Sequence, residues 1–66
     1  MKDTILTIGE TYLVRTTQGY CEARLNDIRG TYSALAMKVT TRYYCTILGT
    51  GRQIVLKSSE KFIRKI

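Results

Sequence analysis

The sequence predicts an all-β protein, a small closed or nearly closed barrel of five to six short antiparallel strands, with a short 3-10 turn before the last strand. Apolar and polar residues alternate along several short runs, which is typical of half-buried strands. Glycine-containing turn signals separate these runs, and the chain contains no proline. Closing such a sheet into a barrel removes its exposed edges.

The chain is expected to form one domain over residues 1–66, with residues 1–8 as an N-terminal arm or a short first strand. Its 44% hydrophobic and 24% charged residues are typical of a globular chain. A chain this short hides only about 60% of its unfolded surface. Its stability margin is therefore expected to be thin, which makes homo-oligomerisation favourable.

The first half of the chain predicts two strands, residues 11–17 and 20–28, each ended by a turn signal. These signals are Gln18-Gly19 and Arg29-Gly30, where glycine allows a positive φ. Strict alternation would also send Glu22 and Asp27 to opposite faces of their strand.

Residues 31–41, "TYSALAMKVTT", are ambiguous. Helical spacing would align Tyr32, Leu35, Ala36 and Val39, and several of these residues favour helices. A strand fits the surrounding β pattern better, so we predict a strand.

The second half predicts strands at residues 42–48, 52–57 and 62–66, with a glycine turn over residues 49–51. Ser58 or Ser59 is a candidate N-cap for a 3-10 turn, with Glu60 in its first turn. The inward phases of all strands define a predicted core: Tyr12, Val14, Cys21, Ala23, Leu25, Tyr43, Cys45, Ile47, Ile54 and Ile63.

The net charge of +6 is unevenly distributed. Residues 1–33 are neutral overall, because four basic residues balance four acidic ones, whereas residues 34–66 hold seven basic residues and one acid, Glu60. Such asymmetry indicates a polyanionic partner. Surface lysines that only improve solubility are the alternative explanation.

The order of these segments resembles the SH3-like barrels of the Tudor and KOW type. The resemblance rests on Gly9, on Tyr20 with Ala23, on the glycines at 49 and 51, and on the closing "IRKI" of residues 63–66. It implies an SH3-like fold that in different members binds DNA, RNA, proteins or peptides. The aromatic cage of methyl-lysine readers is not matched, because Ile47 and Leu48 replace the usual aromatic residue.

The segments "GRQIV" and "FIRKI" are also similar to a region of the plasmid-borne type II dihydrofolate reductases, with Gln53 and Ile54 at matching places. Val55 replaces the tyrosine of that region, and the tryptophan-bearing second strand is absent. The chain also has no histidine and no phosphate-binding glycine loop. We therefore predict no enzyme activity, no cofactor and no metal site.

The favoured hypothesis is a small basic protein that binds nucleic acid, DNA or RNA, through the cationic surface of its second half. The candidate contacts are phosphate-binding cations, one stacking tyrosine and one amide: Lys38, Arg42, Tyr44, Arg52, Gln53, Lys57, Lys61, Arg64 and Lys65.

The alternative hypothesis is a protein-interaction module, for example a phage or mobile-element inhibitor that binds an acidic surface of a host protein. Four tyrosines would line its groove: Tyr12, Tyr20, Tyr32 and Tyr44. With no apolar run long enough to span a membrane and no signal peptide, the predicted location is the cytoplasm. Cys21 and Cys45 are then expected to be free thiols.

Overall fold

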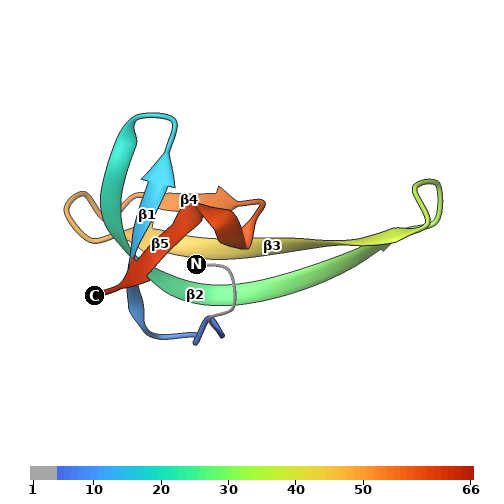
Figure 1. The fold of residues 1–66 in the computed structure, drawn as a ribbon, viewed down its shortest axis with the longest axis horizontal. Helices are drawn as coiled ribbons and strands as arrows, with labels where there is room; N and C mark the ends of the chain where they lie inside the picture. Colours follow the sequence, from blue (N-terminus) through green and yellow to red (C-terminus); the bar gives the residue numbers. More distant parts are fainter. Residues whose placement is uncertain (1–4) are drawn as a thin grey trace.

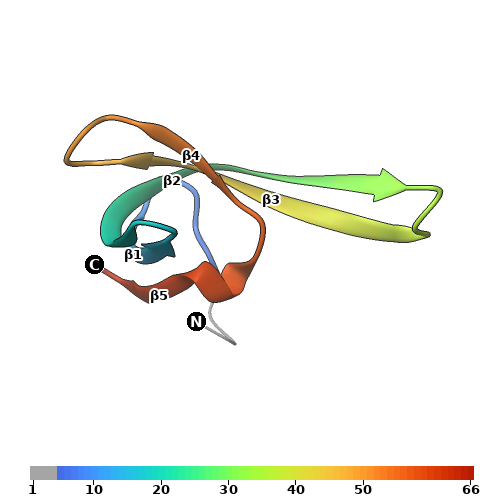
Figure 2. The same ribbon diagram turned by 90° about the horizontal axis from the view of Figure 1, so that it is seen from above.

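The computed structural model describes residues 5–66 and contains five antiparallel strands and one 3-10 turn (Figure 1). The elements are β1 Thr11–Thr16, β2 Gly19–Ser33, β3 Lys38–Ile47, β4 Gln53–Leu56, η1 Ser59–Lys61 and β5 Phe62–Lys65. They form one sheet in the order β4-β3-β2-β1-β5. The sheet curls, so that β4 and β5 lie on opposite sides of its curved end (Figure 2).

The all-β prediction and the 3-10 turn are confirmed. Ser58 is the N-cap of η1, and its hydroxyl accepts a hydrogen bond from the Glu60 N–H at 3.2 Å. The sheet is open, however, because within residues 5–66 no strand pairs with the outer edges of β4 and β5. No first strand forms over residues 5–8, and residues 1–4 lie outside the described part. Within that part, no helix has the length and apolar character needed to cross a membrane.

The β2–β3 hairpin is much longer than the sequence predicted. β2 has 15 residues and β3 has 10, and together they extend the molecule to 38 Å along its longest axis (Figures 1 and 2). We call residues 28–43 the arm. At its base Tyr43 still pairs with Leu56 of β4, and beyond the Ile28–Tyr43 pair no third strand within residues 5–66 lies beside the hairpin.

The predicted turn at Arg29-Gly30 is wrong, and the predicted strand over residues 31–41 is confirmed only in part, because residues 31–33 and 38–41 belong to two strands, β2 and β3. β2 continues through Gly30, which pairs with Thr41, and the chain turns instead at residues 34–37. Gly30 has no positive φ, and a Cβ built on it would make an ordinary contact of 3.4 Å with the Val39 side chain, so its backbone is that of a strand residue and not of a turn. Met37 takes the positive φ of the turn, at 52°.

A β-bulge between Leu25 and Asp27 changes which residues of β2 face the core. Before the bulge, odd-numbered residues point inward, and after it Ile28 takes the inward position opposite Tyr43. Asp27 therefore lies on the outer face opposite Tyr44, the same face as Glu22, which corrects the prediction that the two acids lie on opposite faces.

In most strands, the residues that were predicted to point into the core do so. Five predicted core residues are fully buried, namely Tyr12, Val14, Ala23, Leu25 and Cys45. Four more are half-buried, namely Cys21, Tyr43, Ile47 and Ile54.

The prediction for Ile63 is wrong, because its side chain is 38% exposed. Val14 pairs with Phe62 and Leu13 with Arg64, so Ile63 is the extra residue of a bulge in β5. Phe62 takes the buried position instead, and Leu56 of β4 is a second core residue that the sequence analysis missed.

Edge-to-face aromatic contacts hold the curled sheet together. The Phe62 ring lies 5.5 Å from the Tyr12 ring and 5.4 Å from the Tyr43 ring, measured between centroids. The buried Tyr12 hydroxyl accepts a hydrogen bond from the Thr7 N–H at 2.8 Å. These contacts join β1, β3 and β5, although β2 and β1 separate β3 from β5 in the sheet.

Two neighbouring substitutions test this arrangement. Phe62→Ala is expected to lower the free energy of unfolding by about 3–5 kcal/mol, because it removes the ring that two other rings contact. Ile63→Ala is expected to cost less than about 1 kcal/mol, because the bulge places Ile63 at the surface. Urea denaturation followed by circular dichroism measures both, with Phe62→Leu as the milder variant if Phe62→Ala does not fold. Equal losses of stability at the two positions would contradict the placement of Phe62 in the core and of Ile63 at the surface.

Candidate nucleic-acid interface and the β4 cleft

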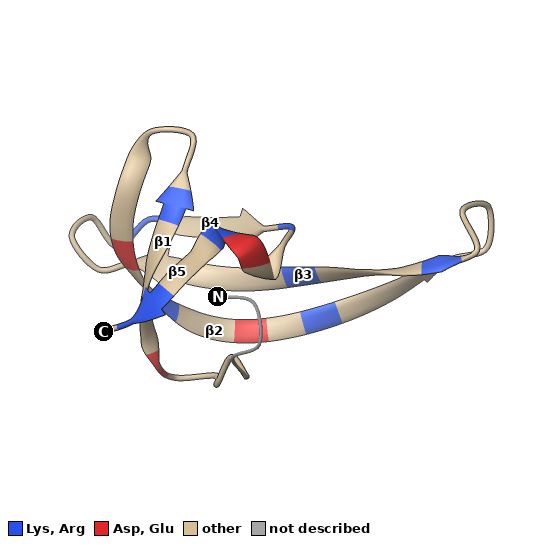
Figure 3. Cartoon of the chain, viewed as in Figure 1, with Lys and Arg blue, Asp and Glu red and all other residues tan. Residues whose placement is uncertain are grey.

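The nine predicted contact residues do not form one surface. The structure places four of them on the outer face of the sheet, three along the free edge of β4, and two on β5. Figure 3 shows that the basic residues are spread over several strands. Here the outer face is the side of the sheet opposite the core.

The first group contains Lys38, Arg42, Tyr44 and Gln53. Residues paired across neighbouring strands point to the same face of a sheet, and successive residues of one strand point to opposite faces. Cys45 and Leu56 are buried in the core, and the four residues alternate with them along β3 and β4, so all four lie on the outer face. Arg42 is half-buried and lies directly opposite Arg29 of β2.

Arg29 is a member of this group that the sequence analysis missed. Its Nε donates a hydrogen bond to Asp27 at 2.8 Å, and its guanidinium lies 5.4 Å from the centre of the Tyr44 ring. The hydrogen bond from Arg29, with a second from the Ile28 N–H, holds the pKa of Asp27 below its ordinary value. One side of the predicted stacking residue Tyr44 is thus already covered by a cation.

The arm carries no acidic residue between its base and its tip. Residues 28–43 contain Arg29, Lys38 and Arg42, and the nearest acid is Asp27, just below the arm. Arg29 and Arg42 lie directly opposite each other, and like charges in this position destabilise a sheet. Asp27 forms its ion pair with Arg29, so it offsets the repulsion for that residue only. The outer face of the arm therefore has an excess of positive charge.

The tip of the arm exposes large apolar side chains. Leu35 is fully exposed and Met37 is 79% exposed, and Tyr32 and Val39 pair across the strands just below them. The sequence analysis considered Leu35, Met37 and Val39 only as parts of a strand or a helix, and Tyr32 also as part of a tyrosine-lined groove. Their concentration in eight residues with no acid was the signal that could have identified them.

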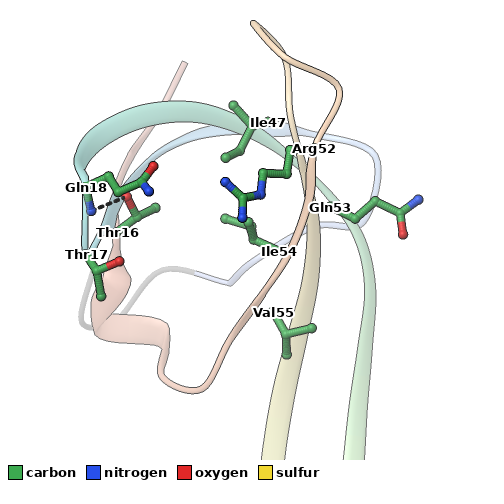
Figure 4. Close-up of a pocket in the computed structure, with 8 residues that line it drawn as sticks. All are labelled: Thr16, Thr17, Gln18, Ile47, Arg52, Gln53, Ile54 and Val55. Carbon is green, nitrogen blue, oxygen red and sulfur yellow. Dashed lines mark hydrogen bonds between the residues drawn. The ribbon is translucent and has the colours of Figure 1, made fainter.

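The second group, Arg52, Lys57 and Lys61, lines a cleft along the free edge of β4. Two adjoining hollows of about 300 Å³ each make up this β4 cleft, between β4 and residues 16–18. In Figure 4 the Arg52 guanidinium points into the cleft between Ile47 and Ile54, whereas Gln53 points to the opposite side. Arg52 and Gln53 therefore belong to different surfaces.

The last two predicted contacts, Arg64 and Lys65, lie on β5, away from both groups. The Lys65 Nζ lies 3.5 Å from a carboxylate oxygen of Glu10, so this cation already has an acidic neighbour. Arg64 lies opposite Leu13 and is exposed.

The tyrosine groove of the alternative hypothesis does not form as predicted. Tyr12 is 1% exposed and belongs to the core. Tyr20 follows the β1–β2 turn and Tyr32 lies near the tip of the arm, so these exposed rings do not share a surface with each other.

The two cysteines are not joined by a disulfide, and Cys45 is buried. Burial, with the nearby Cys21 thiol as a smaller contribution, raises the pKa of Cys45 to about 11. Among the residues that the structure describes, no three histidine, cysteine or carboxylate side chains are grouped to hold a metal ion.

Comparison of the chain with protein-family models, with curated proteins and with solved structures gave no match.

The Cys45 pKa predicts a loss of stability at alkaline pH. The pKa of the Cys45 thiol is about 11 in the folded chain and 9.0 in the unfolded chain. The stability that the buried, protonated thiol contributes is therefore complete below pH 9 and is lost as the pH rises to 11. The loss is at most about 2–3 kcal/mol. Urea denaturation at a series of pH values measures it, and Cys45→Ala is expected to flatten the curve, whereas Cys21→Ala leaves most of it. An identical pH dependence in the parent and Cys45→Ala would contradict this assignment.

Proposed function

We propose that the protein binds nucleic acid through the outer face of its arm. The observation that carries this proposal is the row of Arg29, Arg42 and Lys38, beside which Asp27 is the one acid among residues 5–66. Arg42 and Lys38 are four residues apart on one strand, so they lie roughly 13 Å apart along the arm. Cations spaced in this way can each neutralise a different phosphate of a polyanion.

The shape of the arm favours a duplex. The major groove of B-form DNA, about 12 Å wide, admits a two-stranded β-ribbon. The outer face also offers hydroxyl groups from two threonines that pair across the arm, Thr31 and Thr40, and hydroxyl groups are common phosphate ligands. Apolar tips such as that formed by Leu35 and Met37 can pack against base edges or insert between base steps.

We further propose that the curled sheet is an SH3-like barrel from which the arm projects. Two features support this: the last strand pairs with the first, and the 3-10 turn directly precedes that last strand. In this proposal the barrel is the folded base that holds the arm, and the arm is the binding element.

A double charge reversal tests the interface. Lys38→Glu/Arg42→Glu is expected to lower the affinity for a duplex oligonucleotide at least tenfold. Fluorescence anisotropy at several salt concentrations measures it, with a single-stranded oligonucleotide in parallel. Three phosphate contacts predict that the parent loses affinity roughly 40-fold between about 50 and 200 mM salt. The variant is expected to have a shallower salt dependence. Its fold should persist, because a glutamate at 42 would face Arg29 across the strands.

Arg52→Glu/Arg64→Glu is the matched control, with the same change in net charge at exposed positions off the arm. It is expected to retain affinity within about threefold of the parent, because screening limits the reach of exposed charges. Equal losses in the two double variants would show that only net charge matters and would contradict an interface on the arm. A parent that binds neither oligonucleotide at low salt would overturn the proposed function.

A further inference from the structure

We propose that the β4 cleft is a second binding site, which takes an extended acidic peptide as an additional strand beside β4. This inference does not rest on the proposed function, because the cleft and the arm use different residues. It rests on three features of the cleft: free backbone groups on one wall, cations at both ends, and an apolar centre.

The free backbone groups follow from the pairing of β4 with β3. The Ile47 N–H donates to the Arg52 carbonyl at 2.8 Å, and hydrogen-bonded pairs alternate with non-bonded pairs along an antiparallel ladder. The backbone N–H and C=O groups of Gln53 and Val55 therefore point away from β3, toward the cleft. No strand within residues 5–66 pairs with them. Unpaired groups in a row of this kind form a template for strand addition.

The charges of the cleft select the chemistry of the peptide. Arg52 lines one end, and Arg15, Lys57 and Lys61 line the other, whereas none of the lining residues is acidic. The ion pairs within residues 5–66 are Arg29–Asp27 and Lys65–Glu10, so these four cations have no carboxylate within 4 Å. A peptide strand with carboxylates near both ends complements this arrangement.

The centre of the cleft defines the spacing of those carboxylates. Ile54 is half-buried and lines both hollows, with Thr16 and Thr17 on the opposite wall. Residues i, i+2 and i+4 of an extended peptide share one face, and the outer two lie roughly 13 Å apart. The expected ligand therefore has acidic residues at i and i+4 and an apolar residue at i+2, which packs on Ile54.

A nucleic acid would also be attracted to these cations, but it has no backbone N–H and C=O groups to pair with an open strand edge. Hydrogen bonds to the backbone groups of Gln53 and Val55 therefore distinguish a bound peptide from a bound oligonucleotide at this site. A substitution that removes only the backbone donor can distinguish the two ligands.

Val55→Pro is that substitution. Proline removes the N–H that faces the cleft and leaves the hydrogen bonds between β4 and β3 intact, so an edge strand tolerates it. Val55→Thr is the matched control, because it changes the side chain and keeps the donor. The probe is a peptide with the core Glu-Thr-Val-Thr-Glu, blocked at both ends, and binding is followed by amide chemical shifts of the full chain. A second peptide is methylated on the backbone nitrogens that would face β4.

The parent is expected to bind the first peptide with shift changes at Gln53 and Val55, and to bind the methylated peptide at least tenfold more weakly. Val55→Pro and Arg52→Glu are each expected to lose at least tenfold in affinity, and Val55→Thr to stay within threefold. If Val55→Pro does not fold, the methylated peptide alone decides the question.

Three results would overturn the inference: equal binding of the two peptides, no binding of the first peptide, or tighter binding of a single-stranded oligonucleotide that depends on Arg52 and not on the Val55 N–H. None of these results bears on the arm, because Lys38 and Arg42 are unchanged in every protein used. Conversely, failure of the duplex experiment leaves the peptide prediction intact.

Discussion

The contacts of Phe62 with Tyr12 and Tyr43 are the interaction on which the rest of the structure depends. In a flat sheet, β3 and β5 would be separated by two strands, too far for their side chains to touch. The 5.4 Å contact between the Tyr43 and Phe62 rings therefore requires the sheet to curl. In so small a chain, few side chains are fully buried, and these two contacts join β5, at one end of the sheet, to β1 and to β3.

The same curl determines where the molecule is open. It brings the free edge of β4 opposite residues 16–18 without pairing the two, and the β4 cleft is the space between them. It also covers only the first part of the β2–β3 hairpin. Beyond Ile28 and Tyr43 no layer from the described part of the chain packs against the ribbon, so its tip residues stay exposed (Figure 2). The arm is thus a two-stranded ribbon, an element that is marginally stable in isolation.

Positive charge is distributed according to this architecture. The sequence places the excess in the second half of the chain, but that half contributes β3 to the arm, β4 to the cleft and β5 to the opposite edge. Arg42 and Arg52 are 10 residues apart and lie on separate surfaces, whereas Arg29 and Arg42 are 13 residues apart and lie directly opposite each other. The described residues thus form two separate cationic surfaces, one on a two-stranded ribbon and one beside an open strand edge.

The sequence by itself determined the β class, most strand positions, the turns at Gln18-Gly19 and at residues 49–51, and the inward direction of nine of the ten predicted core residues. These follow from local alternation and turn chemistry, which depend only on near neighbours in the chain. Only the tertiary structure decided three further points. Gly30 lies within a strand because the pairing of β2 with β3 continues past it, with Thr41 as its partner. The bulges beside Leu25 and at Ile63 move Asp27 to the outer face and exchange Ile63 for Phe62 in the core. The candidate cations separate into distinct surfaces because they follow strands that the curl of the sheet carries apart, and no local pattern encodes that curl.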